Sequence, residues 1–163
     1  MLNVYQMEIV AKEFLKKEYD LELIVPIVLN GRLKSTKGCF RHKEVNGKQT
    51  PVKIEMNKLF VEYNRQEIVL SVLKHELVHY AFCMMGKVHC SDGHPIFEQE
   101  LKRLDIISQN TINNFKIASK MQIYQCSDCS HEYKRYKRLS KRGIYSCKCG
   151  GNLLDKGQRI VNA

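Results

Sequence analysis

The sequence predicts an α+β protein in two parts, and three observations lead to this fold class. An apolar run over residues 68–85 that contains the motif H-E-x-x-H predicts a buried central helix. Before it, residues 39–45 and 51–57 alternate apolar and charged side chains, which predicts a small antiparallel sheet. Two cysteine pairs near the C-terminus predict a separate small module. The predicted first domain, cysteine module and tail are residues 1–120, 121–155 and 156–163.

The first domain is expected to begin with an amphipathic helix over residues 3–18. Apolar side chains recur there at near-helical spacing, and Asn3 suits the N-cap position. Residues 23–29 form a strand candidate, in which Pro26 favours an edge position or an irregular start because it lacks a backbone N–H. Asn30-Gly31 then predicts a turn.

The sheet and the helices that follow it are predicted from turn and cap residues. Residues 46–49 (Asn-Gly-Lys-Gln) predict the turn of a hairpin between the two alternating segments. The motif helix is expected to start near residues 65–67 and to stop before Gly86. Pro95 suits the first turn of a further helix that runs to about Leu104. Residues 105–122 are rich in Asn and Ser and predict a short helix or linker.

The H-E-x-x-H motif predicts a metal site on the central helix. At helical spacing His75 and His79 lie one turn apart on one face, so both imidazoles can point at one ion. Zinc suits nitrogen ligands, and a catalytic zinc site needs a third protein ligand and an open position for water. Glu76 is placed to take a proton from that water. The alternative is a pair of core histidines whose polar atoms are satisfied by carbonyl groups.

Two histidines after the motif helix are candidates for the third ligand. We prefer His94, because Pro95 fixes it at the start of the next helix. His89 lies in a looser stretch and is the runner-up.

Composition places the chain among ordinary cytosolic proteins. Its 163 residues, 44% of them hydrophobic, are enough to bury a core. The N-terminus lacks the basic and apolar regions of a signal peptide, and no apolar run is long enough to cross a bilayer. We therefore expect a cytoplasmic protein with no membrane partner. We therefore expect its seven cysteines to be reduced, so cysteine pairs favour a metal site over a disulfide.

The cysteine pairs of the C-terminal module have the spacing of a zinc ribbon. Cys126 and Cys129 form a C-x-x-C pair, and seventeen residues separate it from the pair Cys147 and Cys149. The second pair is C-x-C, so this knuckle must be tighter than usual, or His131 replaces one thiolate. So small a module has little core without a structural zinc ion. The alternative is four reduced cysteines in a mobile tail.

The net charge of +10 is concentrated in the same module. Residues 120–163 hold 10 Lys and Arg against 3 Asp and Glu, which leaves only +3 for the rest of the chain. Basic side chains neutralise phosphates and tyrosines stack on bases, so a mixture of the two favours nucleic-acid binding. A solvated basic face is the alternative interpretation. The candidate nucleic-acid-binding residues are Lys134, Arg135, Tyr136, Lys137, Arg138, Lys141 and Arg142.

Taken together, these motifs resemble the SprT-like proteins, which are zinc metallopeptidase relatives that include the eukaryotic protease Spartan. The resemblance is closest to the short bacterial members and covers about residues 2–155. The third His of bacterial members usually lies four or five residues before an aromatic residue, whereas Phe97 follows His94 by three. The gap of 15 from His79 to His94 is similar to Spartan-like spacing. The segments that carry the resemblance are residues 30–33 with Thr36 and Gly38, 54–57, 74–80, 93–97 and the tail from 124–126.

The resemblance implies a zincin-like metallopeptidase domain followed by a zinc ribbon. In that family context His75, His79 and His94 would bind a catalytic zinc ion, and Glu76 would be the general base. The expected substrates are proteins, including DNA-associated ones brought to the site by the basic ribbon. The alternative function is a nucleic-acid-binding or regulatory zinc protein in which the H-E-x-x-H site is catalytically idle.

Overall fold

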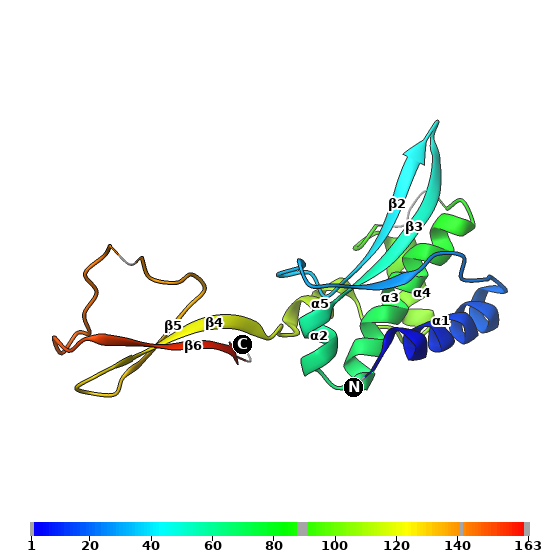
Figure 1. Ribbon diagram of the computed structural model, residues 1–163. Coiled ribbons are helices and arrows are strands. Elements are labelled where there is room, and N and C mark those ends of the chain that lie inside the picture. The colour runs from blue at the N-terminus through cyan, green and yellow to red at the C-terminus, as the bar shows by residue number, and fades with distance from the viewer. Residues whose placement is uncertain (1, 88–90, 141, 162–163) are drawn as a thin grey trace. The chain divides into compact units, whose positions relative to one another are not determined.

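The computed structural model describes residues 2–87, 91–140 and 142–161. The chain divides into two compact units, Met1–Ile117 and Ala118–Ala163 (Figure 1). Two of the predicted site residues, His89 and Lys141, lie outside the described residues. No helix in the described part of the chain is long and apolar enough to cross a membrane.

The first unit contains helices on one face of a three-stranded sheet. Its helix α1 begins with a capping box, in which Asn3 accepts from the backbone N–H of Gln6 and the Gln6 side chain accepts from that of Asn3. The helix is one residue offset from the predicted span. The elements of this unit are α1 (Val4–Tyr19), β1 (Ile27–Asn30), β2 (Gly38–Val45), β3 (Lys48–Asn57), α2 (Lys58–Tyr63), α3 (Gln66–Met84), α4 (Pro95–Arg103) and α5 (Gln109–Asn114).

The sheet has the strand order β1-β3-β2 and mixes parallel and antiparallel pairs. Strands β2 and β3 form the predicted antiparallel hairpin, whereas β1 lies parallel to β3, so the small sheet that the sequence predicts as antiparallel is mixed. The first strand begins at Ile27 because Pro26 has no N–H to donate. The carbonyl of Pro26 still accepts a hydrogen bond from the Ile54 N–H at 3.0 Å.

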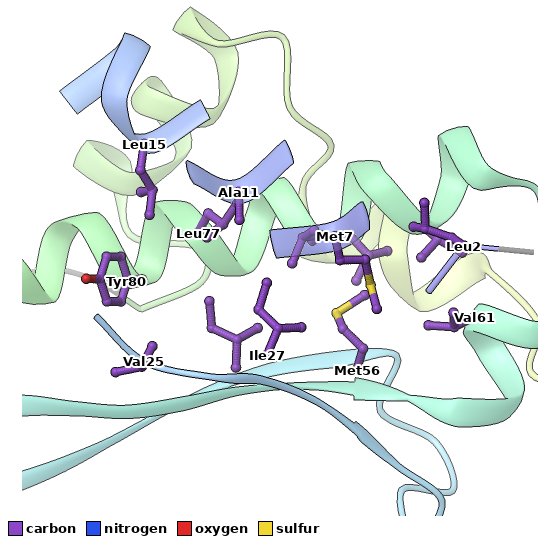
Figure 2. Packing of buried hydrophobic residues seen from close by; sticks show 14 of the residues in the cluster. Leu2, Met7, Ala11, Leu15, Val25, Ile27, Met56, Val61, Leu77 and Tyr80 are labelled. Carbon is purple, nitrogen blue, oxygen red and sulfur yellow. The ribbon is translucent and has the colours of Figure 1, made fainter. Parts of the chain in front are cut away.

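The core of the first unit lies between the sheet and the helices α1 and α3 (Figure 2). Met7, Ala11 and Leu15 follow one face of α1 and are fully buried. Tyr80 of α3 is also fully buried, and its hydroxyl donates to the Glu22 carbonyl at 2.6 Å and accepts from the Ile24 N–H at 3.2 Å. These two bonds connect the motif helix to the chain that leads into β1, because a buried hydroxyl needs partners.

Asn57 fixes the loop between β1 and β2. The side chain of this buried residue caps the short helix α2, which the sequence did not predict, by accepting from the Phe60 N–H at 3.1 Å. Its amide group donates to the carbonyls of Leu33 and Thr36 at 2.8 and 3.0 Å. One amide therefore holds the loop, the end of β3 and the start of α2 together.

The second unit is a three-stranded antiparallel sheet with the order β5-β4-β6. Its strands are β4 (Ser119–Cys126), β5 (Glu132–Arg135) and β6 (Leu153–Val161). Residues 156–161, which the sequence assigned to a tail, continue β6 and pair with the first half of β4. The two cysteine pairs lie at the end of this sheet where β4 stops and β6 starts.

Candidate metal centres

The motif helix α3 holds the two motif histidines on its buried side. Most of its residues are buried, so the helix is apolar nearly all round and packs on several elements at once. His75 has no exposed surface, and the side chain of His79 is 14% exposed. The two ring centroids lie 5.0 Å apart, one helical turn along α3. The helix therefore presents two imidazoles to the same volume, as the spacing predicts.

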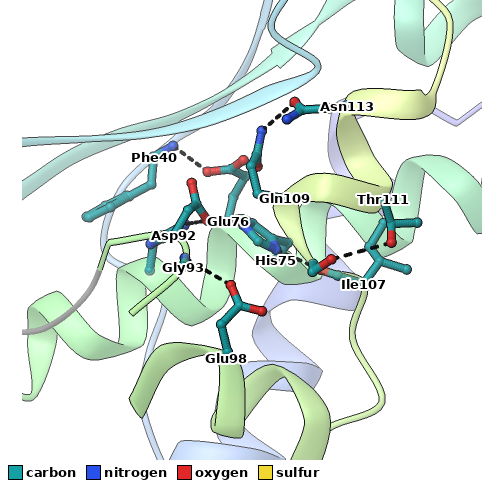
Figure 3. Close-up of polar contacts among 12 residues, drawn as sticks. Phe40, His75, Glu76, Asp92, Gly93, Glu98, Ile107, Gln109, Thr111 and Asn113 are labelled. Carbon is teal, nitrogen blue, oxygen red and sulfur yellow. Dashed lines mark hydrogen bonds and ion pairs between the residues drawn. The ribbon is translucent and has the colours of Figure 1, made fainter. Parts of the chain in front are cut away.

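The ring of His75 has a defined hydrogen-bonding direction. Its Nδ1 lies 2.8 Å from the carbonyl oxygen of Ile107, which can only accept (Figure 3). Nδ1 must therefore carry a proton, and in a neutral ring Nε2 is left with a free lone pair. A histidine anchored through one nitrogen in this way is the usual arrangement of a metal ligand.

Asp92 completes a group of three possible ligands. Its Oδ1 lies 2.9 Å from Nε2 of His75 and 3.2 Å from Nε2 of His79. One ligand atom from each of these residues lies within 4.8 Å of the others, and this group can hold a metal ion. Burial alone would raise the pKa of Asp92, but its contacts with the two histidines outweigh burial and lower that pKa.

Phe97 of α4 fixes the position of the two rings. It stacks on His79 with the ring centroids 4.1 Å apart and the planes 16° from parallel, and it meets His75 edge-on at 5.5 Å. Phe97 is fully buried and packs edge-on against Phe82. The aromatic contact limits rotation of both imidazoles, which keeps their nitrogen atoms directed at Asp92.

Glu76 lies beside the group and is held by the edge of the sheet. Its Oε2 accepts a hydrogen bond from the backbone N–H of Phe40 in β2 at 2.8 Å, and the residue is 6% exposed (Figure 3). Burial raises its pKa, and the neighbouring histidines oppose that rise. Gly38 leaves room for this carboxylate, because a Cβ there would lie 3.0 Å from Cγ of Glu76.

His94, the preferred third ligand of the sequence prediction, lies at the N-cap of α4. Its Nδ1 accepts from the backbone N–H of Ile96 at 3.3 Å, so it performs the role that Asn or Asp usually has at a helix start. Among the described residues, the group that meets at the metal position contains Asp92 and not His94. Asp92 was missed in the sequence, although it lies only two residues before His94.

The four cysteines of the second unit meet in a second group that can hold a metal ion. Cys126 and Cys149 have their sulfurs 3.4 Å apart, and those of Cys129 and Cys147 lie 3.5 Å apart. All four sulfurs lie within 4.8 Å of one another. Disulfide sulfurs would be about 2 Å apart, whereas sulfurs around a tetrahedral zinc ion are about 3.8 Å apart. The spacing therefore excludes these two disulfides, and the four sulfurs could hold one metal ion.

The shortened C-x-C knuckle closes by means of two glycines. Gly150 has a φ of +93°, and its N–H donates to the Cys147 carbonyl at 2.9 Å. Gly151 passes so close to the first knuckle that a Cβ would lie 2.7 Å from the sulfur of Cys126. His131, the alternative ligand, packs edge-on against Tyr133 at 4.7 Å and is not part of the cysteine group.

Tyr133 lies against Cys147 and favours the thiolate form of that residue. Its hydroxyl is 3.1 Å from the sulfur of Cys147 and accepts from the Lys148 N–H at 3.4 Å. A backbone N–H from Cys149 and this hydroxyl lower the pKa of Cys147 to about 6. Because metals bind the thiolate and not the thiol, this environment suits a ligand.

The predicted nucleic-acid-binding residues form an exposed set in the second unit. Lys134 and Arg135 lie on β5, and Tyr136, which follows the strand, is 77% exposed. Arg138 differs from the others because its guanidinium donates to Asp155 at 3.1 Å. The remaining described members, Lys137 and Arg142, are also exposed.

Comparison with known proteins gives a consistent picture. A family model described as the SprT-like family matches residues 7–120. A protein named "Protein SprT-like" from Bacillus cereus ATCC 14579 is 27% identical over 154 residues, covering 93% of this chain and 95% of the relative. Proteins of the same name from Geobacillus sp. WCH70 and Streptococcus thermophilus LMD-9 are 29% and 28% identical, over 94% and 77% of this chain and 94% and 80% of those relatives.

No solved structure is significantly similar to this chain. The family model covers well over half of the sequence, and the match includes the motif helix, Asp92 and His94. The chain therefore belongs to the SprT-like family.

Proposed function

We propose that this protein is a zinc-dependent peptidase with a zincin-like active site on α3. The observation that carries the proposal is the meeting of two imidazole nitrogens and a carboxylate oxygen beside a buried glutamate. The donor atoms fit zinc, which accepts nitrogen and oxygen ligands in a tetrahedral shell and keeps one position open in catalytic sites. His75 and His79 are the two motif ligands, and the sequence predicts His94, with His89 as the runner-up, as the third.

Each residue of the site has a defined part in peptide hydrolysis. Zinc, when bound, supplies Lewis-acid chemistry: it lowers the pKa of a water molecule and polarises a carbonyl group. Glu76 accepts the proton of the attacking water and returns it to the leaving amine. The Phe40 N–H holds one oxygen of this carboxylate, which orients the other. The raised pKa of Glu76 suits a group that must both take and give a proton near neutral pH.

The substitution Glu76→Gln tests the peptidase. It removes the base and keeps the shape of the side chain, so we expect the metal content to be unchanged and cleavage of an unfolded test protein to fall at least 100-fold. Glu67→Gln is the matched control, because Glu67 is exposed in the first turn of the same helix. Cleavage by the Glu76→Gln protein at the wild-type rate would refute the assignment.

We further propose that the four-cysteine group holds a structural zinc ion and that the second unit binds nucleic acid. Exposed cations on and after β5, together with the exposed Tyr136, support this proposal. Such a surface would bring the peptidase to DNA-associated protein substrates. Cations provide most of the affinity for a phosphate backbone, and an exposed aromatic ring offers a face on which a base can stack.

Binding to single-stranded DNA at several salt concentrations tests this surface. The variant changes four exposed cations of the second unit to alanine: Lys134, Arg135, Lys137 and Arg142. Arg138 stays, because it is paired with Asp155. If all four contact phosphates, the slope of log affinity against log salt should fall by about 3. The control removes four exposed lysines of the first unit, Lys12, Lys43, Lys48 and Lys58. Equal slopes for both variants would place any DNA contact elsewhere.

A further inference from the structure

The second unit contains a cavity of about 390 Å³ between its sheet and the connection from β5 to β6. The connection is fixed at this point, because the Leu139 N–H donates to the hydroxyl of the buried Tyr124 at 2.9 Å. The lining includes Tyr124, Arg138, Leu139, Tyr145, Leu153 and Asp155. Hydrogen-bonded backbone therefore shapes this cavity.

Arg138 lines the cavity with its guanidinium held in one orientation. Its Nε donates to Oδ2 of Asp155 at 3.1 Å, and Oδ1 accepts from the Gly157 N–H at 2.8 Å and from the Gln122 side chain. The Gly157 N–H, Gln122 and Arg138 lower the pKa of Asp155, so this carboxylate stays ionised near neutral pH. The terminal nitrogens of Arg138 have no hydrogen-bond partner among the described residues, and its side chain is 70% exposed. A planar fork of N–H groups is therefore available to a ligand.

Tyr145 provides an aromatic wall of the cavity. The residue is 42% exposed, and the backbone of Gly143 lies against its ring, so that a Cβ at Gly143 would overlap Cε2 and Cζ. Glycine therefore lets the ring pack on the connection, and the rest of the ring surface is open to a ligand. A second cavity of about 340 Å³ shares Leu139, Tyr145 and Leu153 with the first. Two adjoining cavities suit a ligand that repeats flat groups along a chain.

The charge of the second unit favours nucleic acid as this ligand. Residues 120–163 carry 10 Lys and Arg against 3 Asp and Glu, and Arg135 on β5 lines the second cavity. Such a surface attracts a phosphate backbone, and an aromatic ring offers a face on which a base can stack. A base must leave the duplex stack to enter a cavity, which favours a single strand.

The guanidinium of Arg138 determines which bases suit the cavity. A guanidinium only donates, so its fork pairs best with two acceptors that lie side by side. Guanine offers O6 and N7 in this arrangement, and unpaired cytosine offers O2 and N3. Adenine and thymine have no such pair, because an N–H group lies beside or between their acceptors.

We propose that this cavity binds one unpaired guanine or cytosine of a single-stranded nucleic acid, with Arg138 bonded to two adjacent acceptors and Tyr145 stacked on the base. The inference rests on the proposed nucleic-acid binding of the second unit and adds base selectivity to it. Phosphate contacts of the exposed cations carry no sequence information, whereas this contact does.

Binding of the full-length chain to short oligothymidine strands tests the proposal. The strands differ only in one central base, which is dG, dC, dA or dT, so their phosphate contacts are equal. We expect the dG and dC strands to bind about tenfold more tightly than the other two. Equal affinities would overturn this proposal and leave nucleic-acid binding intact, whereas no binding to any strand would overturn both. The same series in oligouridine distinguishes RNA from DNA, and the base preference must appear in the series that binds more tightly.

Arg138→Lys keeps the charge and removes the fork. The base preference should disappear, while the affinity for plain oligothymidine should stay within about twofold. Arg159→Lys is the matched control, because Arg159 is also an exposed arginine paired with a carboxylate, that of Glu132 at 3.1 Å, and it does not line the cavity. A preference that persists in Arg138→Lys, or that is lost in Arg159→Lys, would overturn the proposal.

A fluorescence signal locates the bound base. The chain has no tryptophan, so Tyr145→Trp places a single reporter on the cavity wall. Saturation with the dG strand should quench its emission, because the base stacks on the ring. Unchanged emission at saturation would overturn the proposal. A glutamate-rich peptide that binds more tightly than the dG strand and changes the same emission would also overturn it, since the cavity would then take an acidic peptide.

Discussion

Gly38 provides a sharp test of how the sheet positions the carboxylate of Glu76, the proposed general base. A Cβ at this position would lie 2.9 Å from Cγ1 of Val72, 3.0 Å from Cγ of Glu76 and 3.1 Å from its Oε1. Carbon atoms pack best at about 3.5 to 4.0 Å, so Gly38→Ala forces both side chains, or the strand, to move by several tenths of an ångström. Overpacking of this kind costs about 1 to 3 kcal/mol.

The expected loss for Gly38→Ala is therefore about 2 kcal/mol in the free energy of unfolding, even though alanine itself suits a strand better than glycine. Displacement of Glu76 should also lower peptidase activity by up to about 100-fold, because proton transfer depends on distances of a few tenths of an ångström. Urea unfolding at pH 7 and cleavage of an unfolded protein measure the two effects.

Gly31→Ala is the control for Gly38→Ala. No atom lies within 4 Å of a Cβ at Gly31, and its φ is not in the left-handed region. We expect this variant to be within about 0.5 kcal/mol of the wild type. If Gly38→Ala proves as stable and as active as Gly31→Ala, the close approach of β2 to Glu76 does not position the carboxylate and the reasoning fails.

Two further predictions concern a buried carboxylate of the sheet and the cysteine knuckle. Hydrogen bonds from Lys53 and Arg41 lower the pKa of Glu55 to about 2, from 4.5. The ionised Glu55 should therefore stabilise the fold above about pH 4.5 and lose this effect as the pH falls toward 2. Since both partners are at least 40% exposed, the contribution is discounted for screening to about 1 to 2 kcal/mol. The difference in melting temperature between the wild type and Glu55→Gln should be largest at pH 7 and shrink toward pH 3; a constant difference would contradict this. Gly151→Ala places a Cβ 2.7 Å from the sulfur of Cys126, so the purified variant should lose one zinc ion per chain, and retention of both ions would show that the knuckle can shift.

Local sequence patterns predicted much of the fold because the responsible contacts are local. The capping residue Asn3, the turn at Asn46-Gly47 and Pro95 at a helix start all act within a few residues, and each element lies close to its predicted span. The parallel pairing of β1 with β3 was not predicted, because strand order depends on contacts between distant segments. The short helix α2 was missed because Asn57, its cap, ends a strand pattern.

The candidate site likewise contains side chains that local spacing predicts and groups that it does not. His75, His79 and Glu76 follow from helical spacing, and the four cysteines follow from their pairwise spacing. The Phe40 N–H and the Ile107 carbonyl are backbone groups, which any residue offers, so no sequence pattern marks them. Asp92 lies in the same group but belongs to no ligand motif, so the sequence pattern did not single it out.

The hydrogen bond from His75 to the Ile107 carbonyl connects the candidate metal site to the segment between α4 and α5. Metal binding at His75 should therefore be detectable in that segment. A cation on Nε2 draws electron density from the ring, which makes the proton on Nδ1 a stronger donor to that carbonyl. The neighbouring Ile106 amide, which donates to the Leu101 carbonyl at 2.8 Å, should then exchange with deuterated solvent more slowly. Occupancy could thus be followed at a backbone position, with neither a substrate nor a chromophore.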